Sequence, residues 1–143
     1  VEYLVDTYDK QNTISFAAGS KEYYLAKQWL HFQVSGQGPY FGQAVWFSRF
    51  HSEKVQSAID RYVNEIRRVS GVLNRALQGK KYLVGDKFSY VDAAFVPWNL
   101  YPGQFGIDME KEFPNVDAWS KLVQERPAIA KSVQDRADAC ARR

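Results

Sequence analysis

The sequence predicts an all-α fold, a single helical bundle, from three observations. Apolar residues recur at steps of three and four over several long stretches, which is the period of an amphipathic helix. Serine, glycine and proline stand where such helices would begin and end. No stretch alternates apolar and polar side chains as a half-buried strand does. With 143 residues, of which 45% are hydrophobic and 15% aromatic, the chain can bury the core of one domain.

The first predicted element is a short helix over residues 1–8, followed by a polar turn over residues 9–13. Two turns of helix are marginal in water on their own, so this helix needs a surface to cover. We expect its apolar side to stay exposed unless a partner covers it. That side consists of Val1, Leu4, Val5 and Tyr8.

The second helix begins after Ser20, a favourable N-cap residue, and carries Leu25, Trp29 and Phe32 on one side. Residues 35–39 then place two glycines and a proline in succession, which should break or bend the helix. Residues 40–50 resume an aromatic-rich helical stretch. A bent backbone beside aromatic side chains predicts the wall of a pocket.

The third predicted helix has the clearest periodicity in the chain. Ser52 is its expected cap, and Gly79 is the glycine expected to end it. Its apolar positions are Val55, Ile59, Tyr62, Ile66, Val69, Leu73 and Leu77.

A glycine turn then leads to Ser89 and Asp92, which form a capping-box pattern with Asp in place of the usual Glu or Gln. We assign both residues to the backbone donors of a helix start, a structural role and not a catalytic one. The helix after them is nearly all apolar over residues 93–98, so we expect it at the buried centre of the domain with Trp98 inside. Pro114 and Pro127 start two peripheral helices.

Composition argues against several classes of function. A net charge of +3, spread along the chain, does not indicate a nucleic-acid-binding protein. Cys140 is the single cysteine, so no intrachain disulfide can form, and no His/Cys cluster has the spacing of a metal site. His31 and His51 have no orienting carboxylate at obvious spacing, and we expect both at the surface or an interface.

The ends of the chain and its hydropathy carry two further expectations. No apolar run approaches the roughly eighteen residues of a membrane span. No signal peptide opens the sequence, so we expect a cytoplasmic protein that does not bind membranes. Because the sequence does not begin with Met, we also expect a fragment or a processed form of a longer protein.

Two stretches carry a resemblance to a known family. Residues 82–98, YLVGDKFSYVDAAFVPW, resemble the capping box and central helix of the C-terminal domain of cytosolic glutathione S-transferases. Residues 28–43, QWLHFQVSGQGPYFGQ, are similar to the fungal transferases of the yeast nitrogen-regulator (prion) class and their bacterial nu-class relatives. The resemblance extends to residues 113–129 and covers essentially the whole chain, which implies the helical bundle of that domain.

The resemblance also implies a division of the chain. Residues 1–13 resemble the end of the last helix of the family's N-terminal thioredoxin-like domain plus a linker, and residues 14–143 resemble the C-terminal helical domain. The glutathione-binding Glu-Ser pair and the thiol-activating residue of the family would lie before Val1. We therefore expect no catalytic residue in this chain, with glutathione as the co-substrate of a full-length parent and no metal.

The resemblance implies which side chains would serve the parent enzyme. The expected wall of the electrophile pocket is Trp29, Gln33, Gln37, Gly38, Pro39, Tyr40, Phe41 and Phe47. The aromatic members are equally consistent with core packing. The residues that could reach a glutathione carboxylate across a dimer interface are Arg61, Arg67 and Arg68, although a solvated helix face also explains them.

Two functions are implied by the resemblance. The first is the substrate-binding and dimerisation domain of a homodimeric glutathione transferase that conjugates a hydrophobic electrophile or reduces a disulfide. The alternative is a non-catalytic regulatory or protein-interaction module with the same fold, because fold alone does not determine function.

Overall fold

The computed structural model describes residues 1–142, and every regular element in this range is helical. The α-helices are α1 (Glu2–Tyr8), α2 (Lys21–Phe32), α3 (Gly38–Val45), α4 (Gln56–Ala76), α5 (Tyr90–Asn99), α6 (Met109–Glu112), α7 (Pro114–Gln124) and α8 (Pro127–Ala141). Two π-helical turns, Gln33–Gln37 and Trp46–Phe50, come after α2 and α3, and a short 3₁₀ turn, Pro102–Phe105, precedes α6. The all-α prediction is confirmed.

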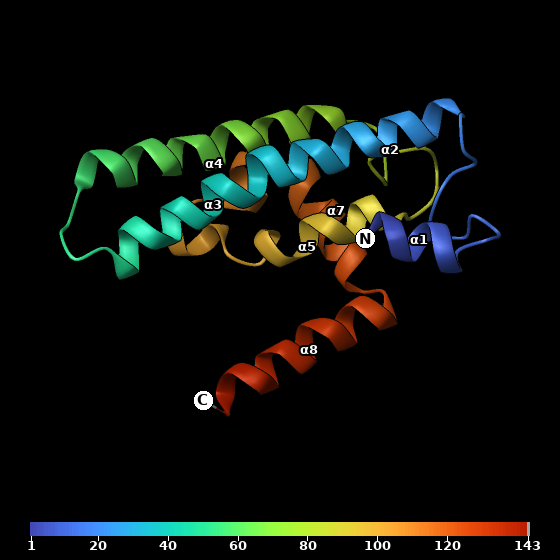
Figure 1. Cartoon of the computed structure of the whole chain (residues 1–143). Helices are drawn as coiled ribbons and strands as arrows, with labels where there is room; N and C mark the ends of the chain where they lie inside the picture. The colour runs from blue at the N-terminus through green and yellow to red at the C-terminus, as the bar shows by residue number, and fades with distance from the viewer. Residues whose placement is uncertain (143) are drawn as a thin grey trace.

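Helices α2 and α3 form one long rod that packs along α4 (Figure 1). Helix α5 packs against α2 on one side and α7 on the other. Helix α8 extends away from this bundle, and none of its described residues is buried (Figure 1). The bundle therefore leaves two helices, α1 and α8, at its periphery.

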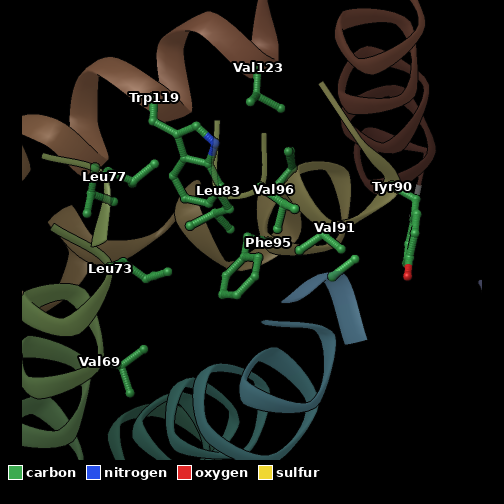
Figure 2. Close-up of a cluster of buried hydrophobic side chains, with 13 residues drawn as sticks. Val69, Leu73, Leu77, Leu83, Tyr90, Val91, Phe95, Val96, Trp119 and Val123 are labelled. Carbon is green, nitrogen blue, oxygen red and sulfur yellow. The ribbon is translucent and has the colours of Figure 1, made fainter. Parts of the chain in front are cut away.

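The main core lies where α4, α5 and α7 meet, and Figure 2 shows its side chains pointing toward one another. Val69 and Leu73 of α4 face Phe95 of α5, and the Phe95 ring meets Trp119 of α7 edge to face at 5.6 Å. A second, smaller cluster fills the space between α3 and α4. It consists of Phe41, Ala44, Ile66 and Ile107.

The predicted helix ends are partly confirmed. The Tyr23 amide donates to Ser20 Oγ at 3.1 Å, so Ser20 caps α2 as expected. The prediction for Ser52 is wrong, because α4 starts at Gln56 and Ser52 lies in the preceding loop. A serine caps a helix only when the amides two or three residues later are already helical, and here residues 53–55 are not.

The interruption expected at residues 35–39 takes the form of a π turn and not of a break in the helix. Gly38 has φ −55° and ψ −56°, an ordinary right-handed helical conformation. Its amide donates to the Gln33 carbonyl, five residues back, so the turn before Pro39 is π-helical. In a π turn each amide bonds to the carbonyl five residues back instead of four. This shift accommodates Pro39, which has no N–H to donate. The helix therefore continues through Pro39, with π geometry replacing α geometry over Gln33–Gln37.

The capping box at the start of α5 is larger than its two residues. Asp92 is fully buried, and its Oδ2 accepts bonds from the Ser89 amide at 2.9 Å and the Ser89 hydroxyl at 3.0 Å. Its Oδ1 accepts from the Leu83 amide at 3.0 Å and from Trp119 Nε1 at 2.9 Å. One carboxylate thus joins the loop before α5, the start of α5, and α7.

The remaining expectations for the last helices hold with one exception. Helices α7 and α8 begin at Pro114 and Pro127 as predicted. In α5, Phe95 and Val96 are buried, but Trp98 is only half-buried, so the expectation that Trp98 lies inside is wrong. Helix α5 is central over its first two turns and reaches the surface after that.

Candidate functional site

The predicted pocket residues divide between two sides of the α2–α3 rod. Gln33 and Gln37 face α5, where Gln37 is completely buried. Its amide nitrogen donates to Asn99 Oδ1 at 2.8 Å and to the Phe95 carbonyl at 3.4 Å. Gln33 Nε2 donates in turn to Gln37 Oε1 at 3.3 Å. These amides form a polar link between two helices.

Gly38 and Phe41 lie on the same side as this link. The Phe41 ring is buried with its centroid 5.8 Å from that of Trp98. A Cβ at Gly38 would lie 3.6 Å from Trp98 Nε1, an ordinary van der Waals contact. Gly38 therefore packs against α5, and Phe41 packs against both Trp98 of α5 and the α3–α4 cluster.

Tyr40 and Phe47 face α4 instead. The Arg68 guanidinium lies over the Tyr40 ring, 5.8 Å from its centroid. Phe47 stacks on Tyr62 of α4 at 5.7 Å and on His51 at 5.0 Å. This aromatic stack closes the end of the α3–α4 pair, and all three of its rings are half-buried.

Trp29 and Pro39 complete the predicted set. Trp29 is half-buried, with its ring edge to face against Phe32 at 5.5 Å. Pro39 alone among the eight residues is exposed. The eight residues therefore lie along one helical rod, where seven of them are buried or half-buried and only Pro39 is exposed to solvent.

The exposed side of the rod carries large apolar groups that sequence reasoning missed. Trp46 and Phe50 are 50% and 66% exposed, and their ring centroids lie 6.2 Å apart. Tyr24 and Val34 are also exposed, at 62% and 61%. Helical register could have indicated that these four side chains are exposed, because their positions lie outside the apolar stripe of Leu25, Trp29 and Phe32 that marks the packed side.

Helix α1 presents a second apolar surface. Val1, Leu4 and Tyr8 are more than half exposed, as expected, whereas Val5, the fourth residue of that side, is half-buried and packs against the main core. An apolar hollow of about 460 Å³ lies between α1, the start of α5 and the start of α8. Leu4 of α1, Ala94 of α5 and Ile129 of α8 are among the residues that line it.

The three predicted arginines lie on α4 with different partners. Arg67 Nε donates to Glu112 at 3.1 Å, and Arg68 Nε donates to Glu65 at 2.7 Å. The hydrogen bond from Arg68 to Glu65 raises the pKa of the Arg68 guanidinium above its usual value. Within the described residues Arg61 makes no ion pair, and its guanidinium lies 6.0 Å from the centre of the Tyr62 ring.

No group of metal-ligating side chains comes together within residues 1–142. The histidines serve local structure: His31 Nδ1 lies 2.7 Å from the Lys27 carbonyl, and His51 Nδ1 accepts from the Glu53 amide at 3.1 Å. Cys140 is exposed near the end of α8. Among the described helices, none combines the length and apolar character that a membrane crossing needs.

Comparison with known proteins agrees with this geometry. The family of glutathione S-transferase C-terminal domains matches residues 38–127. The glutathione S-transferase-like protein tpcF of Aspergillus fumigatus is 47% identical over 94% of this chain. Glutathione S-transferase 2 of Schizosaccharomyces pombe is 43% identical over 96% of it. The chain spans 65% of the length of each of these two relatives.

Solved structures give the same answer at the level of the backbone. The glutathione transferase URE2P8 from Phanerochaete chrysosporium, solved with oxidized glutathione, superposes with a TM-score of 0.94 at 42% identity, over 99% of this chain and 65% of that one. URE2P6 from the same fungus, also with oxidized glutathione, gives 0.91 at 51% identity, over 96% and 64%. A helical bundle with this element order and these relatives makes the chain a member of the glutathione S-transferase C-terminal domain family.

Proposed function

We propose that this chain is the electrophile-binding and dimerisation half of a fungal glutathione transferase, working with a thioredoxin-like half that holds glutathione. The observation that carries the proposal is the uncovered apolar surface of α1 and of the outer side of the α2–α3 rod, where Leu4, Tyr24 and Trp46 are at least half exposed. Exposed apolar surface of this extent favours a partner domain or a ligand. Glutathione is the expected co-substrate, and the second substrate is a hydrophobic electrophile or a disulfide.

In this proposal the electrophile contacts the exposed side of the rod, at Pro39 and Trp46. The buried members of the predicted set act from behind: Gln37 and Phe41 hold the rod against α5, which keeps Pro39 in place. A pocket wall on a rigid helix is better defined than one on a loop, because its side chains are positioned by the packing behind them.

We place the carboxylate contact across a homodimer interface at Arg61. A guanidinium binds a carboxylate best through two parallel hydrogen bonds, which requires donors that are not already engaged. Arg67 and Arg68 each have an acidic partner, Glu112 and Glu65, whereas Arg61 has none among residues 1–142. Arg61 is therefore the first of the three to test.

The relatives support a transferase more than a regulator. The transcriptional regulator URE2 of Saccharomyces cerevisiae is 34% identical over 92% of this chain, and the match covers 47% of its length. The identity and the two coverages are all lower than those of the two transferase relatives.

The test separates the two halves of the proposed enzyme. The isolated 143-residue chain should neither conjugate 1-chloro-2,4-dinitrobenzene nor change its melting temperature with millimolar glutathione. A fusion that places the thioredoxin-like region of Schizosaccharomyces pombe glutathione S-transferase 2 before Val1 should restore conjugation. In that fusion Trp46→Ala should raise KM for the electrophile about fivefold or more, with KM for glutathione unchanged.

Arg75→Ala, an exposed change on α4, is the matched control and should leave both KM values unchanged. Two results would contradict the proposal: a glutathione-dependent melting shift of several degrees in the isolated chain, or a folded fusion without conjugation or disulfide reduction.

A further inference from the structure

A polar cavity of about 440 Å³ lies between α1, the loop after α1, and the first half of α2. Its walls are formed by Val5 and Ala26 as well as by charged groups. The polar side chains at issue are Glu2, Asp6, Asp9, Lys10, Lys27 and Tyr90. None of these residues belongs to the electrophile surface at Pro39 and Trp46, so a ligand bound in this cavity would be independent of that surface.

The Tyr90 hydroxyl opens into this cavity. The side chain is only 7% exposed, and Figure 2 shows its oxygen pointing away from the hydrophobic cluster. No hydrogen bond joins this hydroxyl to any group of residues 1–142, although every side-chain polar atom sealed from solvent in this range has a partner. The hydroxyl is therefore in contact with the cavity space. Burial raises its pKa, and the nearby Glu2 carboxylate raises it further.

Most of the charges around the cavity already have partners. Lys27 donates to Glu2, and Lys10 Nζ donates to the Asp6 carbonyl at 2.6 Å. Asp9 accepts bonds from the loop that closes the cavity; the donors are Thr13 N at 2.7 Å, Ile14 N at 2.9 Å and Ser15 Oγ at 2.7 Å.

One buried acceptor and one exposed acceptor at the cavity have no protein partner within residues 1–142. The buried one is the Tyr90 hydroxyl oxygen, and the exposed one is the Asp6 carboxylate at the rim, which accepts no hydrogen bond and forms no ion pair. The lining itself holds three carboxylates and two ammonium groups, and Lys87 adjoins it through a bond to the Asn12 carbonyl. The free side-chain groups of Tyr90 and Asp6 are acceptors, which favours a ligand that donates hydrogen bonds.

We propose that this cavity binds a small organic ammonium ion, with the ammonium group donating to the Tyr90 hydroxyl oxygen and to the Asp6 carboxylate. An ammonium has three donors and no acceptor, so it can bind the buried Tyr90 oxygen and the Asp6 carboxylate at the rim and keep one donor for water. Its short alkyl chain lies against Val5 and Ala26, the apolar part of the wall. A carboxylate ligand would be repelled by the unpaired Asp6 carboxylate and has no donor for either acceptor.

The experiment is isothermal titration calorimetry of the 143-residue chain with n-butylammonium chloride, and with sodium butyrate and n-butanol as matched probes. We expect one saturable site for butylammonium up to 50 mM added ligand, and none for the other two. Tyr90→Phe removes one charge-assisted hydrogen bond and should weaken binding about tenfold. Asp6→Asn should weaken it by a similar factor, about tenfold.

Matched controls make the same chemical changes at exposed positions that do not line the cavity: Tyr8→Phe for the hydroxyl and Asp86→Asn for the carboxylate. Both should bind butylammonium as the parent chain does, and circular dichroism should show all four variants folded. The proposal is overturned if butylammonium does not saturate a site, if butyrate binds as well, or if folded Tyr90→Phe and Asp6→Asn bind unchanged. If Tyr90→Phe does not fold, Asp6→Asn alone decides.

Discussion

Replacing Asp92 with alanine tests the hydrogen-bonded junction at the start of α5. The change removes the acceptor for the Leu83 and Ser89 amides, the Ser89 hydroxyl and the Trp119 indole N–H. A buried donor without a partner costs about 1–3 kcal/mol, and the Ser89 hydroxyl can rotate to another acceptor. Three rigid donors then cost about 3–5 kcal/mol, once their partial relaxation is allowed for.

This loss is large against a total stability of about 5–15 kcal/mol for a typical domain. Urea unfolding, monitored by circular dichroism and by tryptophan fluorescence, measures it directly. Asp92→Asn keeps the size of the side chain but turns an N–H₂ group toward donors, so we expect it to be nearly as destabilising as Asp92→Ala. Asp86→Ala, in an exposed turn, should change stability by no more than about 0.5 kcal/mol. A cost below about 1 kcal/mol for Asp92→Ala, or one equal to that of Asp86→Ala, would refute the reasoning.

Three further predictions concern α1 and the α2–α3 rod. Leu4→Ser should change the free energy of unfolding by less than about 0.5 kcal/mol because Leu4 is 58% exposed, whereas Leu73→Ala, 1% exposed, should cost about 2–5 kcal/mol in urea unfolding. The hydrogen bond from Lys27 lowers the pKa of the Glu2 carboxyl, so this pair stabilises the fold above the unfolded-state pKa and the contribution is lost as pH falls through the lower folded value. Glu2→Gln should therefore make the urea midpoint depend less on pH over the acidic range in which the Glu2 carboxyl is protonated. Gln37→Met breaks the bonds to α5 and should cost about 1–2 kcal/mol in the same unfolding assay.

The controls make the same changes where the structure places the side chain in solvent. Glu53→Gln should leave the acid dependence of the urea midpoint unchanged, and Gln43→Met should leave stability unchanged. A large cost for Leu4→Ser would mean that α1 packs more tightly than its exposure indicates. Equal losses of stability for Gln37→Met and Gln43→Met would contradict the role assigned to Gln37. Equal acid dependence for Glu2→Gln and Glu53→Gln would contradict the role assigned to Glu2.

Local chemistry explains which features of the fold could be predicted from the sequence. The N-cap at Ser20, the glycine and proline helix boundaries and the apolar period of α4 depend on residues within a few positions of one another. The pairing of Ser89 with Asp92 is equally local. The sequence pattern also identified the apolar side of α1, of which Val1, Leu4 and Tyr8 stay exposed while Val5 packs against the core.

Tertiary structure decided what each side of the α2–α3 rod does. Helical spacing grouped the aromatic and amide residues around Pro39. The position of α5 decided that Gln37 bonds to Asn99 and that Phe41 packs on Trp98. The position of α4 decided that Tyr40 lies under the Arg68 guanidinium. The π turn that carries Pro39 through the helix exists because the rod is held along its length by packing, which local propensity does not include.

The same division applies to the charged and polar groups. Sequence alone indicated the fold, the family resemblance, and Asp92 as a cap. It did not indicate that Asp92 also accepts bonds from Leu83 and Trp119, or that the Tyr90 hydroxyl faces a cavity beside Asp6. Those partners are distant in the chain and become neighbours only when α1, α5 and α7 pack together, since a contact between distant residues depends on the arrangement of the helices and not on the local pattern that forms them.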